Sequence, residues 1–495
     1  MKRVLIANRG EIALRIVRAC REEELEAVAV YSAADRNAPH VRAADSAIAI
    51  GPASPRESYL SIDRLIAAAR KSGADAVHPG YGFLAERAAF AEAVEAAGLT
   101  FIGPPAAAIR AMGDKTEARR RMQAAGVPIV PGQSTPLDDL KGASAAAAEV
   151  GYPVMVKAAA GGGGKGMRVV SRPEELEAAL EAARSEAGKA FGDSSIYLEK
   201  FIERPRHIEI QILSDRKRTI HLGERECSIQ RRHQKLVEEA PSMAVSAALR
   251  ERMGSAAVAA GQAVGYLGAG TCEFLVTGDG SFYFLEMNTR IQVEHTVTEL
   301  IYGVDLVREQ LRIAAGQTMG VEQPSPRGWA IECRITSEDP QNNFLPATGR
   351  IDYLKAPAGP GVRWDSGVEI GDEVTLHYDS LLAKLIVWAP DRAQAVARMT
   401  RALEELILSG VATNQVFHRR LMADPAFQRG EIDIQFLERR ADLLQPHHAE
   451  TRTLDLAAAA ALAEDEARRN RRPVVPGEAL SVGEWGRQAR SDALR

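Results

Sequence analysis

The first hundred residues alternate short apolar runs with segments of helical periodicity. Between the first two runs, Ile12, Ile16 and Ala19 recur at the spacing of one helix face. The two runs are separated by about the length that a strand, a helix and a second strand need. This alternation predicts an open parallel sheet with covering helices. The apolar runs are residues 3–7, 27–31, 75–78 and 99–102.

The middle of the chain shows a different pattern. Prolines in Gly126–Pro131 break the alternation and mark a boundary. Tyr152–Lys157 and Met167–Val170 are β-like and are joined by Ala158–Gly166, which predicts a hairpin with a glycine-rich tip. Beyond residue 197, further β-like runs predict a largely antiparallel sheet flanked by helices. They are residues 208–212, 272–276 and 282–285.

The end of the chain differs in composition. Alanine and charged residues dominate Leu456–Arg472, and Pro473 and Pro476 follow. This pattern predicts an isolated helix and an extended tail after about residue 446.

Length and composition indicate a large globular protein. A chain of 495 residues is too long for one core and predicts two to four domains or lobes. No apolar run is long enough to cross a bilayer, so no membrane association is expected. A net charge of -4 argues against nucleic acid as a partner. The N-terminus lacks the pattern of a signal peptide, which favours a cytoplasmic location.

The four cysteines lack metal-ligand spacing. Buried thiols in a reducing compartment are favoured over a redox role. The cysteines are Cys20, Cys227, Cys272 and Cys333.

The glycine-rich tip is the first candidate for chemistry. Gly161–Gly164, followed by Lys165 and Gly166, can approach a polyphosphate and present backbone N–H groups to it. The alternative is a flexible surface turn. Lys157, just before the loop, favours phosphate because a point charge there could meet it. The loop is not a Walker A motif, and no G-x-G-x-x-G follows the first strand, which disfavours a dinucleotide.

Two glutamates are predicted to face each other. Asp279-Gly280, between two strand-like runs, is a preferred centre of a two-residue hairpin. Such a turn would make Glu273 and Glu286 cross-strand neighbours, with Cβ atoms about 5 Å apart. Like charges so placed need neutralising, as Mg²⁺ would do. A solvated pair at the sheet edge is the alternative.

A strand-like alternation continues beyond Glu286. Asn288, Arg290, Gln292 and Glu294 alternate with apolar residues, which predicts one polar and one apolar face. A plain edge strand with a wet face explains alternation equally well. The composition favours a site, because Arg290 can hold a small planar oxyanion and Glu294 could take a proton from it.

Other basic residues are ambiguous by themselves. Lys115 and Lys235 read as surface lysines, and His207 and His233 as ordinary satisfied histidines. His78–Phe83 is predicted to be a turn at the carboxyl end of a parallel strand, where open α/β sheets place ligands.

Several strings together resemble the signatures of biotin carboxylases, in that family's order and over roughly residues 2–440. They are Ile6–Ala13, His78–Leu84, Met112–Lys115, Gly161–Met167, Glu226–Pro241, Phe284–His295 and Glu332–Arg334. Ala160 stands where some members have another glycine, which would slightly stiffen the lid.

The resemblance implies the ATP-grasp fold, of α/β (α+β) class. It combines a Rossmann-like N-terminal open parallel sheet, a small glycine-lid lobe and a C-terminal lobe with a mainly antiparallel sheet. The expected parts are an N-terminal biotin carboxylase domain (1–112), a linker helix (113–129), the lid lobe (130–202), the C-terminal ATP-grasp lobe with the biotin carboxylase C-terminal domain (203–446) and an extension (447–495).

The resemblance also implies a role for each matching residue. ATP would contact Lys115, Lys157, Gly163, Gly164, Glu199, Lys200, Phe201, Ile202, His207 and His233. Mg²⁺ or Mn²⁺ would be held by Glu273, Glu286 and Asn288. Bicarbonate would be cradled by Lys235, Arg290, Gln292 and Val293, with Glu294 as the base. Biotin would contact Arg334 and Tyr81. The implied catalytic residues are Glu294, Arg290, Lys235 and Arg334.

The implied reaction has two stages. Bicarbonate attacks the γ-phosphate of ATP and gives carboxyphosphate and ADP. Carboxyphosphate then releases CO₂ and phosphate, the phosphate removes the N1′ proton of biotin, and Arg334 stabilises the enolate oxygen. A closed lid would keep water from the intermediate.

Partners follow from the same resemblance. No lysine is flanked by methionines as at a biotin attachment site, so either the biotin carboxyl carrier protein and the carboxyltransferase are separate chains or this sequence is truncated. A homodimer is expected. The preferred acceptor is an acyl-CoA, in particular acetyl-CoA of fatty acid biosynthesis, with pyruvate or another acyl-CoA as alternatives. Two rival classes are an ATP-grasp carboxylate-amine ligase and a nucleotide-binding regulatory protein without turnover.

Overall fold

The computed structural model describes residues 1–132, 137, 140–158, 167–191, 194–322, 325–445 and 459–466. The chain divides into two units, Met1–Gln445 and Pro446–Arg495. In the second unit, residues 459–466 are helical and exposed, as the alanine-rich composition predicts.

The N-terminal part of the first unit is the expected open parallel sheet. Its five strands run in the order β3-β2-β1-β4-β5, and every pairing is parallel. The strand β3 was not expected from the sequence. The strands are β1 (Arg3–Ile6), β2 (Glu26–Ser32), β3 (Ser46–Gly51), β4 (Ala76–His78) and β5 (Thr100–Phe101).

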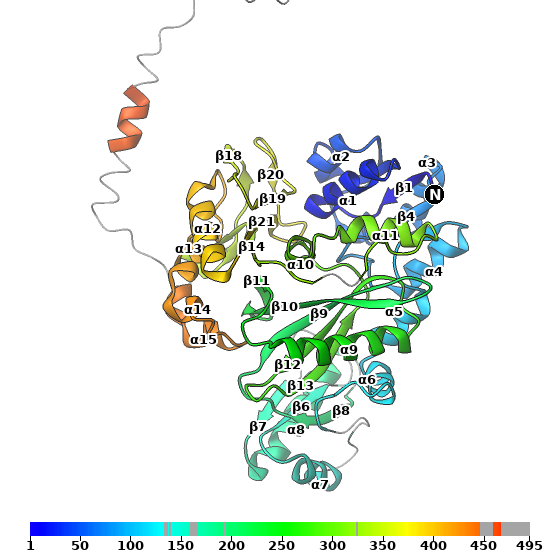
Figure 1. Ribbon diagram of the computed structural model, residues 1–495, viewed down its shortest axis with the longest axis vertical. Coiled ribbons are helices and arrows are strands. Elements are labelled where there is room, and N and C mark those ends of the chain that lie inside the picture. The colour runs from blue at the N-terminus through cyan, green and yellow to red at the C-terminus, as the bar shows by residue number, and fades with distance from the viewer. Residues whose placement is uncertain are drawn as a thin grey trace, which may run out of the picture. The chain divides into compact units, whose positions relative to one another are not determined.

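Helices cover this sheet, and Figure 1 shows them gathered around it in blue and cyan. In the first helix, Ile12, Ile16 and Ala19 are buried, as their spacing predicts. The helices are α1 (Gly10–Glu22), α2 (Pro39–Ala43), α3 (Ile62–Ser72), α4 (Ala88–Ala96) and α5 (Ala106–Gly113). The next helix, α6 (Lys115–Ala124), belongs to another core, in which Ala118 and Met122 pack with residues such as Ile208 and Phe284.

A small lobe follows, at the bottom of the view in Figure 1. Its antiparallel sheet has the order β7-β6-β8, with β6 (Val154–Ala158), β7 (Met167–Val170) and β8 (Ile196–Lys200). The helices α7 (Leu140–Val150) and α8 (Leu176–Phe191) pack on it and enclose a core that includes Val154 and Leu198. The predicted hairpin of β6 and β7 is confirmed. Its tip, with Gly163 and Gly164, lies outside the described residues.

The large lobe is built on an eight-stranded sheet in the order β13-β12-β9-β10-β11-β14-β21-β19. Every pairing described in it is antiparallel, which confirms the expected sheet type. Its strands are β9 (Arg206–Ser214), β10 (Thr219–Arg231), β11 (Gln234–Ala240), β12 (Gly268–Val276), β13 (Phe282–Asn288), β14 (Trp329–Thr336), β19 (Val362–Ser366) and β21 (Leu381–Ala389).

Helices pack on this sheet and bury its apolar positions. The helix α9 begins after Ser246, whose side chain accepts a hydrogen bond from the Leu249 N–H and so satisfies one free donor of the first turn. Asp305 caps α11 in the same way through Arg308 N–H. The helices are α9 (Ala247–Ala263), α10 (His295–Tyr302), α11 (Leu306–Ala314), α12 (Arg392–Glu405), α13 (Gln415–Ala423), α14 (Pro425–Gln428) and α15 (Phe436–Arg439).

Three short two-stranded sheets complete the first unit. They pair β15 (Glu338–Asp339) with β16 (Leu345–Pro346), β17 (Gly349–Arg350) with β20 (Glu373–Val374), and β18 (Tyr353–Lys355) with β22 (Ile407–Ser409).

The hairpin of β12 and β13 pairs Glu273 with Glu286, as expected, although its turn differs. Near the turn the strands pair Val276 with Phe282, so the loop between them is longer than the two residues predicted. A bulge then inserts one extra residue, Leu285, into β13. The bulge restores the predicted register at the two glutamates.

The prediction that a strand continues from Glu286 to Glu294 was wrong. The strand β13 ends at Asn288, and residues 289–294 form a turn that leads into α10. Of residues 289–294, all except Ile291 line a cavity, so the two classes of residue do not lie on opposite faces. A period of two in the sequence cannot distinguish such a turn from a strand.

All four cysteines are buried and unpaired, as expected. In the described part of the chain, helices are too short or too polar to span a bilayer.

Candidate active site

A cleft with a volume of about 1540 Å³ is lined by all three parts of the first unit. The carboxyl ends of β1 and β4, the strands β6 and β8 and the strands β11 to β14 contribute to it. Every described residue to which the family resemblance gives a role lines this cleft. They are Tyr81, Lys115, Lys157, Glu199, Lys200, Phe201, Ile202, His207, His233, Lys235, Glu273, Glu286, Asn288, Arg290, Gln292, Val293, Glu294 and Arg334.

Lys235 on β11 lies at the centre of a buried cluster of carboxylates. Its Nζ is 2.7 Å from Glu209 Oε2, 2.9 Å from Glu273 Oε1 and 2.7 Å from Glu294 Oε1. Burial alone would lower the pKa of Lys235, but the three carboxylates outweigh it and raise that pKa well above its usual value. The lysine is therefore a fixed positive charge that links three glutamates.

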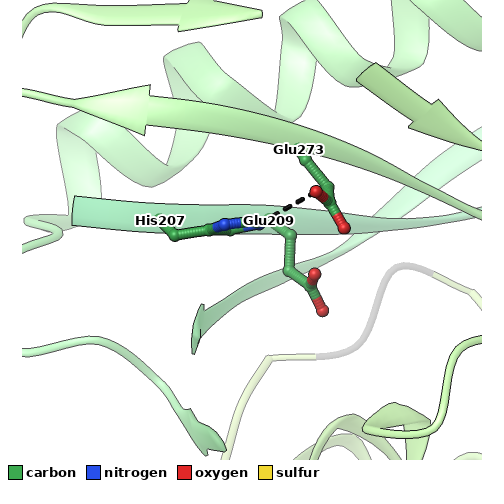
Figure 2. Close-up of side chains that lie close together, drawn as sticks. All are labelled: His207, Glu209 and Glu273. Carbon is green, nitrogen blue, oxygen red and sulfur yellow. Dashed lines mark ion pairs between the residues drawn. The ribbon is translucent and has the colours of Figure 1, made fainter. Parts of the chain in front are cut away.

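His207, Glu209 and Glu273 form a group that resembles a metal site. One ligand atom of each lies within 4.8 Å of the others, and all three residues are buried. Figure 2 shows the His207 ring beside the Glu273 carboxylate, with His207 Nε2 3.0 Å from Glu273 Oε2. Lys235 already supplies a positive charge to Glu209 and Glu273. This group is thus an ion-pair network rather than a separate metal centre.

Glu273 and Glu286 offer a better place for a divalent cation. Among the described residues, none donates a hydrogen bond to Glu286, and its side chain is exposed to the solvent of the cleft. The surrounding cleft walls and the charge of Glu273 raise the pKa of Glu286. Asn288 adds an amide oxygen nearby and donates to Glu273 Oε1 over 2.8 Å. Carboxylate and amide oxygens are the donors that Mg²⁺ prefers, so these residues fit such an ion.

Arg290 is held at the other side of Asn288. Its Nε donates to Glu86 Oε2 over 3.0 Å, and its Nη2 donates to Asn288 Oδ1 over 3.0 Å. Glu86 also accepts a hydrogen bond from the Thr289 N–H. The sequence predicts that Arg290 holds an oxyanion from which Glu294 takes a proton, and it gives no sign of Glu86, the carboxylate that contacts Arg290 directly. Since Glu86 comes from the N-terminal part of the chain, spacing within 286–294 could not reveal it.

Glu294 is the N-cap residue of α10 and is 2% exposed. Its Oε1 contacts Lys235, and its Oε2 accepts from Arg334 Nη2 over 3.0 Å. Burial would raise the pKa of Glu294, but Lys235 and Arg334 outweigh it and hold that pKa well below its usual value. Glu294 is therefore a weak base while both cations contact it. It becomes a stronger base when these cations contact another anion.

Arg225 is a residue that the sequence did not single out. Its guanidinium is fully buried and donates hydrogen bonds that tie β9 and β12 to the turn at 289–294 and to α10. The acceptors are Glu209 Oε1, Gln211 Oε1, Thr271 Oγ1, Gln292 Oε1 and Thr298 Oγ1. The sequence gives no signal for this role, because Arg225 stands between Glu224 and Glu226 in a run of charges that is typical of a solvated surface.

The small lobe contributes a second set of charges. The Glu199 carboxylate, at the end of β8, contacts Lys157 Nζ and lies 2.6 Å from Arg119 Nη1. Lys200 instead donates to the carbonyl oxygens of residues 151 and 152. Its ammonium therefore stabilises the start of β6.

His233 lies in the tight turn between β10 and β11. Arg232 and His233 both have a positive φ, of 50° and 66°. Non-glycine residues rarely adopt this conformation, and such strain concentrates at functional sites. The turn places His233 at the wall of the cleft.

Tyr81 follows the carboxyl end of β4. Its hydroxyl donates to Glu11 Oε1, a buried carboxylate in the first turn of α1. The predicted turn after His78 thus lies at the cleft, as open parallel sheets generally place their ligand-binding loops. His78 itself is fully buried and does not line it.

A small antiparallel lobe and a larger antiparallel sheet that enclose a cleft lined by lysines and paired carboxylates define the ATP-grasp class of enzymes. Three family descriptions match the chain. They are "Biotin carboxylase, N-terminal domain" over residues 1–109, "Carbamoyl-phosphate synthase L chain, ATP binding domain" over 114–321 and "Biotin carboxylase C-terminal domain" over 332–439. The chain belongs to the biotin carboxylase family, whose members are ATP-dependent ligases.

Two curated relatives show how close this similarity is. The biotin carboxylase of Nostoc sp. is 54% identical over 439 residues, which cover 88% of this chain and 98% of that protein. One pyruvate carboxylase subunit of Methanothermobacter thermautotrophicus is 53% identical over 439 residues, covering 88% and 89%.

A solved structure supports the same assignment. The biotin carboxylase domain dimer of the Hydrogenobacter thermophilus 2-oxoglutarate carboxylase, in complex with MgADP, ADP and bicarbonate, is 48% identical and has a TM-score of 0.84. The match covers 91% of this chain and 99% of that one. The activity that these comparisons show for the chain is biotin carboxylase activity.

Proposed function

We propose that the chain carboxylates biotin on a separate biotin carboxyl carrier protein, through carboxyphosphate, as the first half-reaction of an acyl-CoA carboxylase with acetyl-CoA as acceptor. One observation carries the proposed mechanism. Lys235 contacts Glu273, on the side of the proposed metal, and Glu294, on the side of the proposed base. The ammonium therefore lies where a nucleotide phosphate and a bicarbonate ion would meet.

The nucleotide end of the cleft carries the first group of roles. In this proposal ATP contacts Lys115, Lys157, Glu199–Ile202, His207 and His233, together with Gly163 and Gly164. Glu273, Glu286 and Asn288 hold Mg²⁺ or Mn²⁺. When bound, this ion would neutralise negative charge on the phosphates. The Glu199 carboxylate positions Lys157 through their ion pair.

Bicarbonate binds between Lys235 and Arg290, with Gln292 and the Val293 N–H as further donors. Glu294 takes its proton. Because Lys235 and Arg334 hold the pKa of Glu294 low, an anion that draws these cations toward itself makes Glu294 more basic. The oxygen of the deprotonated bicarbonate then attacks the γ-phosphate and displaces ADP.

Biotin enters beside Arg334 and Tyr81. Carboxyphosphate decomposes to CO₂ and phosphate, and the phosphate removes the N1′ proton. Arg334 stabilises the negative charge that develops on the ureido oxygen. Its Nε lies 2.6 Å from Glu238 Oε1, and its Nη2 contacts both Glu238 and Glu294, which holds the guanidinium at the cleft.

The partners in this proposal are a carrier protein and carboxyltransferase subunits in the cytoplasm, and a second copy of this chain. The dimer of the Hydrogenobacter thermophilus relative supports a homodimer. A second candidate acceptor is pyruvate, because the identity to the pyruvate carboxylase relative is within one per cent of that to the Nostoc biotin carboxylase.

A free-biotin assay tests the proposal. The purified chain is incubated with MgATP, with and without bicarbonate and biotin, and ADP and fixed CO₂ are measured. We expect ADP formation that requires bicarbonate and increases with biotin. A carboxylate-amine ligase would form ADP only with an amine acceptor, and a regulatory protein would form none. Adding acetyl-CoA or pyruvate carboxyltransferase subunits with the carrier then identifies the acceptor.

A further inference from the structure

We infer that Lys384 is a positioning residue for bicarbonate, because its buried ammonium holds the backbone of the Val293–Glu294 turn and connects it to Tyr81 through Glu11. Lys384 lies on β21 and is fully buried. Its Nζ donates to the Val293 carbonyl oxygen over 2.8 Å and is 3.1 Å from Glu11 Oε1. This inference rests on the proposed function, because it assumes that bicarbonate binds at this turn. Lys384 itself is not one of the proposed bicarbonate contacts.

The sheet places Lys384 beside Arg334. These two residues are direct partners in the antiparallel pairing of β14 and β21, so their side chains leave the same face of the sheet. Arg334 reaches the carboxylate of Glu294, and Lys384 reaches the carbonyl of Val293. Two neighbouring cations thus hold adjacent parts of one turn.

The backbone of this turn is fixed at two successive peptide groups. The Gln292 carbonyl lies 2.8 Å from His295 Nδ1 and 3.3 Å from the His295 N–H, which orients the peptide that carries the Val293 N–H. Lys384 fixes the next carbonyl, on Val293. Since a peptide group is planar, holding the Val293 oxygen also fixes the direction of the Glu294 N–H, which belongs to the same peptide group. Without Lys384, the Val293 carbonyl would have to find another donor in a buried place.

A buried lysine needs compensating charges, and the structure supplies them. Carboxylates of Glu11, Glu332 and Asp365 face Lys384, as does the guanidinium of Arg363. Burial alone would lower the pKa of Lys384, but the carboxylates outweigh it and raise that pKa. Lys384 therefore carries its positive charge throughout the pH range in which an enzyme of this family can be assayed.

Glu11 connects Lys384 to the proposed biotin side of the cleft. The same oxygen, Oε1, contacts Lys384 and accepts the hydrogen bond of Tyr81. The other oxygen, Oε2, is buried and has no hydrogen-bond partner among the described residues. Lys384 is consequently the only cation that contacts Glu11 directly among the described ion pairs. Moving Lys384 would disturb Tyr81 and Val293 together.

The test distinguishes two possible roles of Lys384, which are positioning of the Val293–Glu294 turn and compensation of the negative charge of Glu11. Lys384→Met removes both the donor and the charge, whereas Lys384→Met combined with Glu11→Gln removes the donor but leaves no uncompensated carboxylate at Glu11. Lys384→Arg keeps the charge with a different geometry. Lys355→Met, at an exposed lysine on β18, is the control for loss of a lysine. Each variant is measured for melting temperature, for bicarbonate-dependent ADP formation and for KM of ATP and bicarbonate.

We expect Lys384→Met to raise the KM for bicarbonate about 10-fold or more and to lower kcat, with the KM for ATP within about twofold. The double variant should regain melting temperature but not bicarbonate affinity. The inference is overturned if the folded double variant has the wild-type KM for bicarbonate, because Lys384 would then only compensate Glu11. It is also overturned if Lys384→Arg or Lys384→Met changes the KM values for ATP and bicarbonate equally.

If Lys384→Met does not fold, the double variant and Lys384→Arg still decide the question. Failure of the proposed function is a separate result. In that case the wild-type chain and Lys355→Met would both lack ADP formation that depends on bicarbonate.

Discussion

Replacing Arg225 with methionine should damage both stability and bicarbonate chemistry. The substitution keeps much of the side-chain volume but removes a guanidinium that is fully buried. Glu209 is also fully buried and, among the described ion pairs, would keep only Lys235 as a cation. Gln292 would lose a donor at 2.6 Å. Breaking a buried ion pair by removing one partner typically costs about 3–5 kcal/mol. We expect a loss of stability of that size.

The kinetic effect follows from the position of Gln292. With this side chain no longer held by Arg225, the turn that carries Glu294 would lose one of its attachments to the sheet. A displacement of about 1 Å at a reacting group can reduce rates about 100-fold. We therefore expect kcat/KM for bicarbonate to fall about 10-fold to 100-fold, while the affinity for MgATP changes much less.

The matched control is another buried ion pair of the strand β10, which carries Arg225. Arg250 on α9 donates two hydrogen bonds of 2.6 Å to Glu224, a buried carboxylate on β10 that does not line the cleft. Urea unfolding followed by circular dichroism measures the stability of Arg225→Met and Arg250→Met, and coupled ADP assays measure the kinetics. The reasoning is refuted if Arg225→Met retains bicarbonate kinetics within twofold of wild type, or if Arg250→Met loses them to the same extent.

Three further predictions concern single residues, two at the cleft and one, Glu332, buried behind it. Glu286→Ala should weaken Mg²⁺-dependent binding of a non-hydrolysable ATP analogue about 10-fold, and an unchanged calorimetric titration would contradict a metal role. Arg334→Met should lower kcat/KM for biotin about 100-fold with the KM for ATP nearly unchanged, and an equal effect on both would contradict its assignment to biotin. Burial raises the pKa of Glu332 from 4.5 to about 8, with Lys384 opposing and Glu238 adding to the shift. The protonated carboxyl therefore contributes stability that is full below pH 4.5 and is lost as the pH rises to about 8. Glu332→Gln should flatten the fall of melting temperature across that window, and parallel curves for variant and wild type would contradict the assignment.

Periodicity predicted the sheets and part of the site. The position of a hairpin turn predicted that Glu273 and Glu286 are cross-strand neighbours, and the structure confirms this pairing. The assumed turn was nevertheless wrong, and a bulge at Leu285 compensates for the longer loop. A bulge depends on twist and packing across neighbouring strands, which no pattern within one hairpin records.

Buried charges were hardest to predict. The strand β10 carries Glu224, Arg225 and Glu226 in succession, and such a run is typical of a solvated surface. In the structure all three are buried and have partners. Arg225 donates to residues of β9, β12 and α10, Glu224 accepts from Arg250 on α9, and Glu226 accepts from Ser242. Lys384 is hidden in the same way within an otherwise apolar strand. Partners distant in sequence decide the burial of these residues, so the sequence around each one is uninformative.

The most direct test of the proposed chemistry follows the oxygen atoms of bicarbonate. The chain is incubated with MgATP, biotin and ¹⁸O-labelled bicarbonate, and the mass of the released phosphate is measured for the wild type and for Glu294→Gln. If bicarbonate is deprotonated by Glu294 and attacks the γ-phosphate, wild-type phosphate gains one labelled oxygen and the variant releases almost no phosphate. Unlabelled phosphate from the wild type would show that water is the nucleophile, and labelled phosphate at the wild-type rate from Glu294→Gln would show that another group is the base.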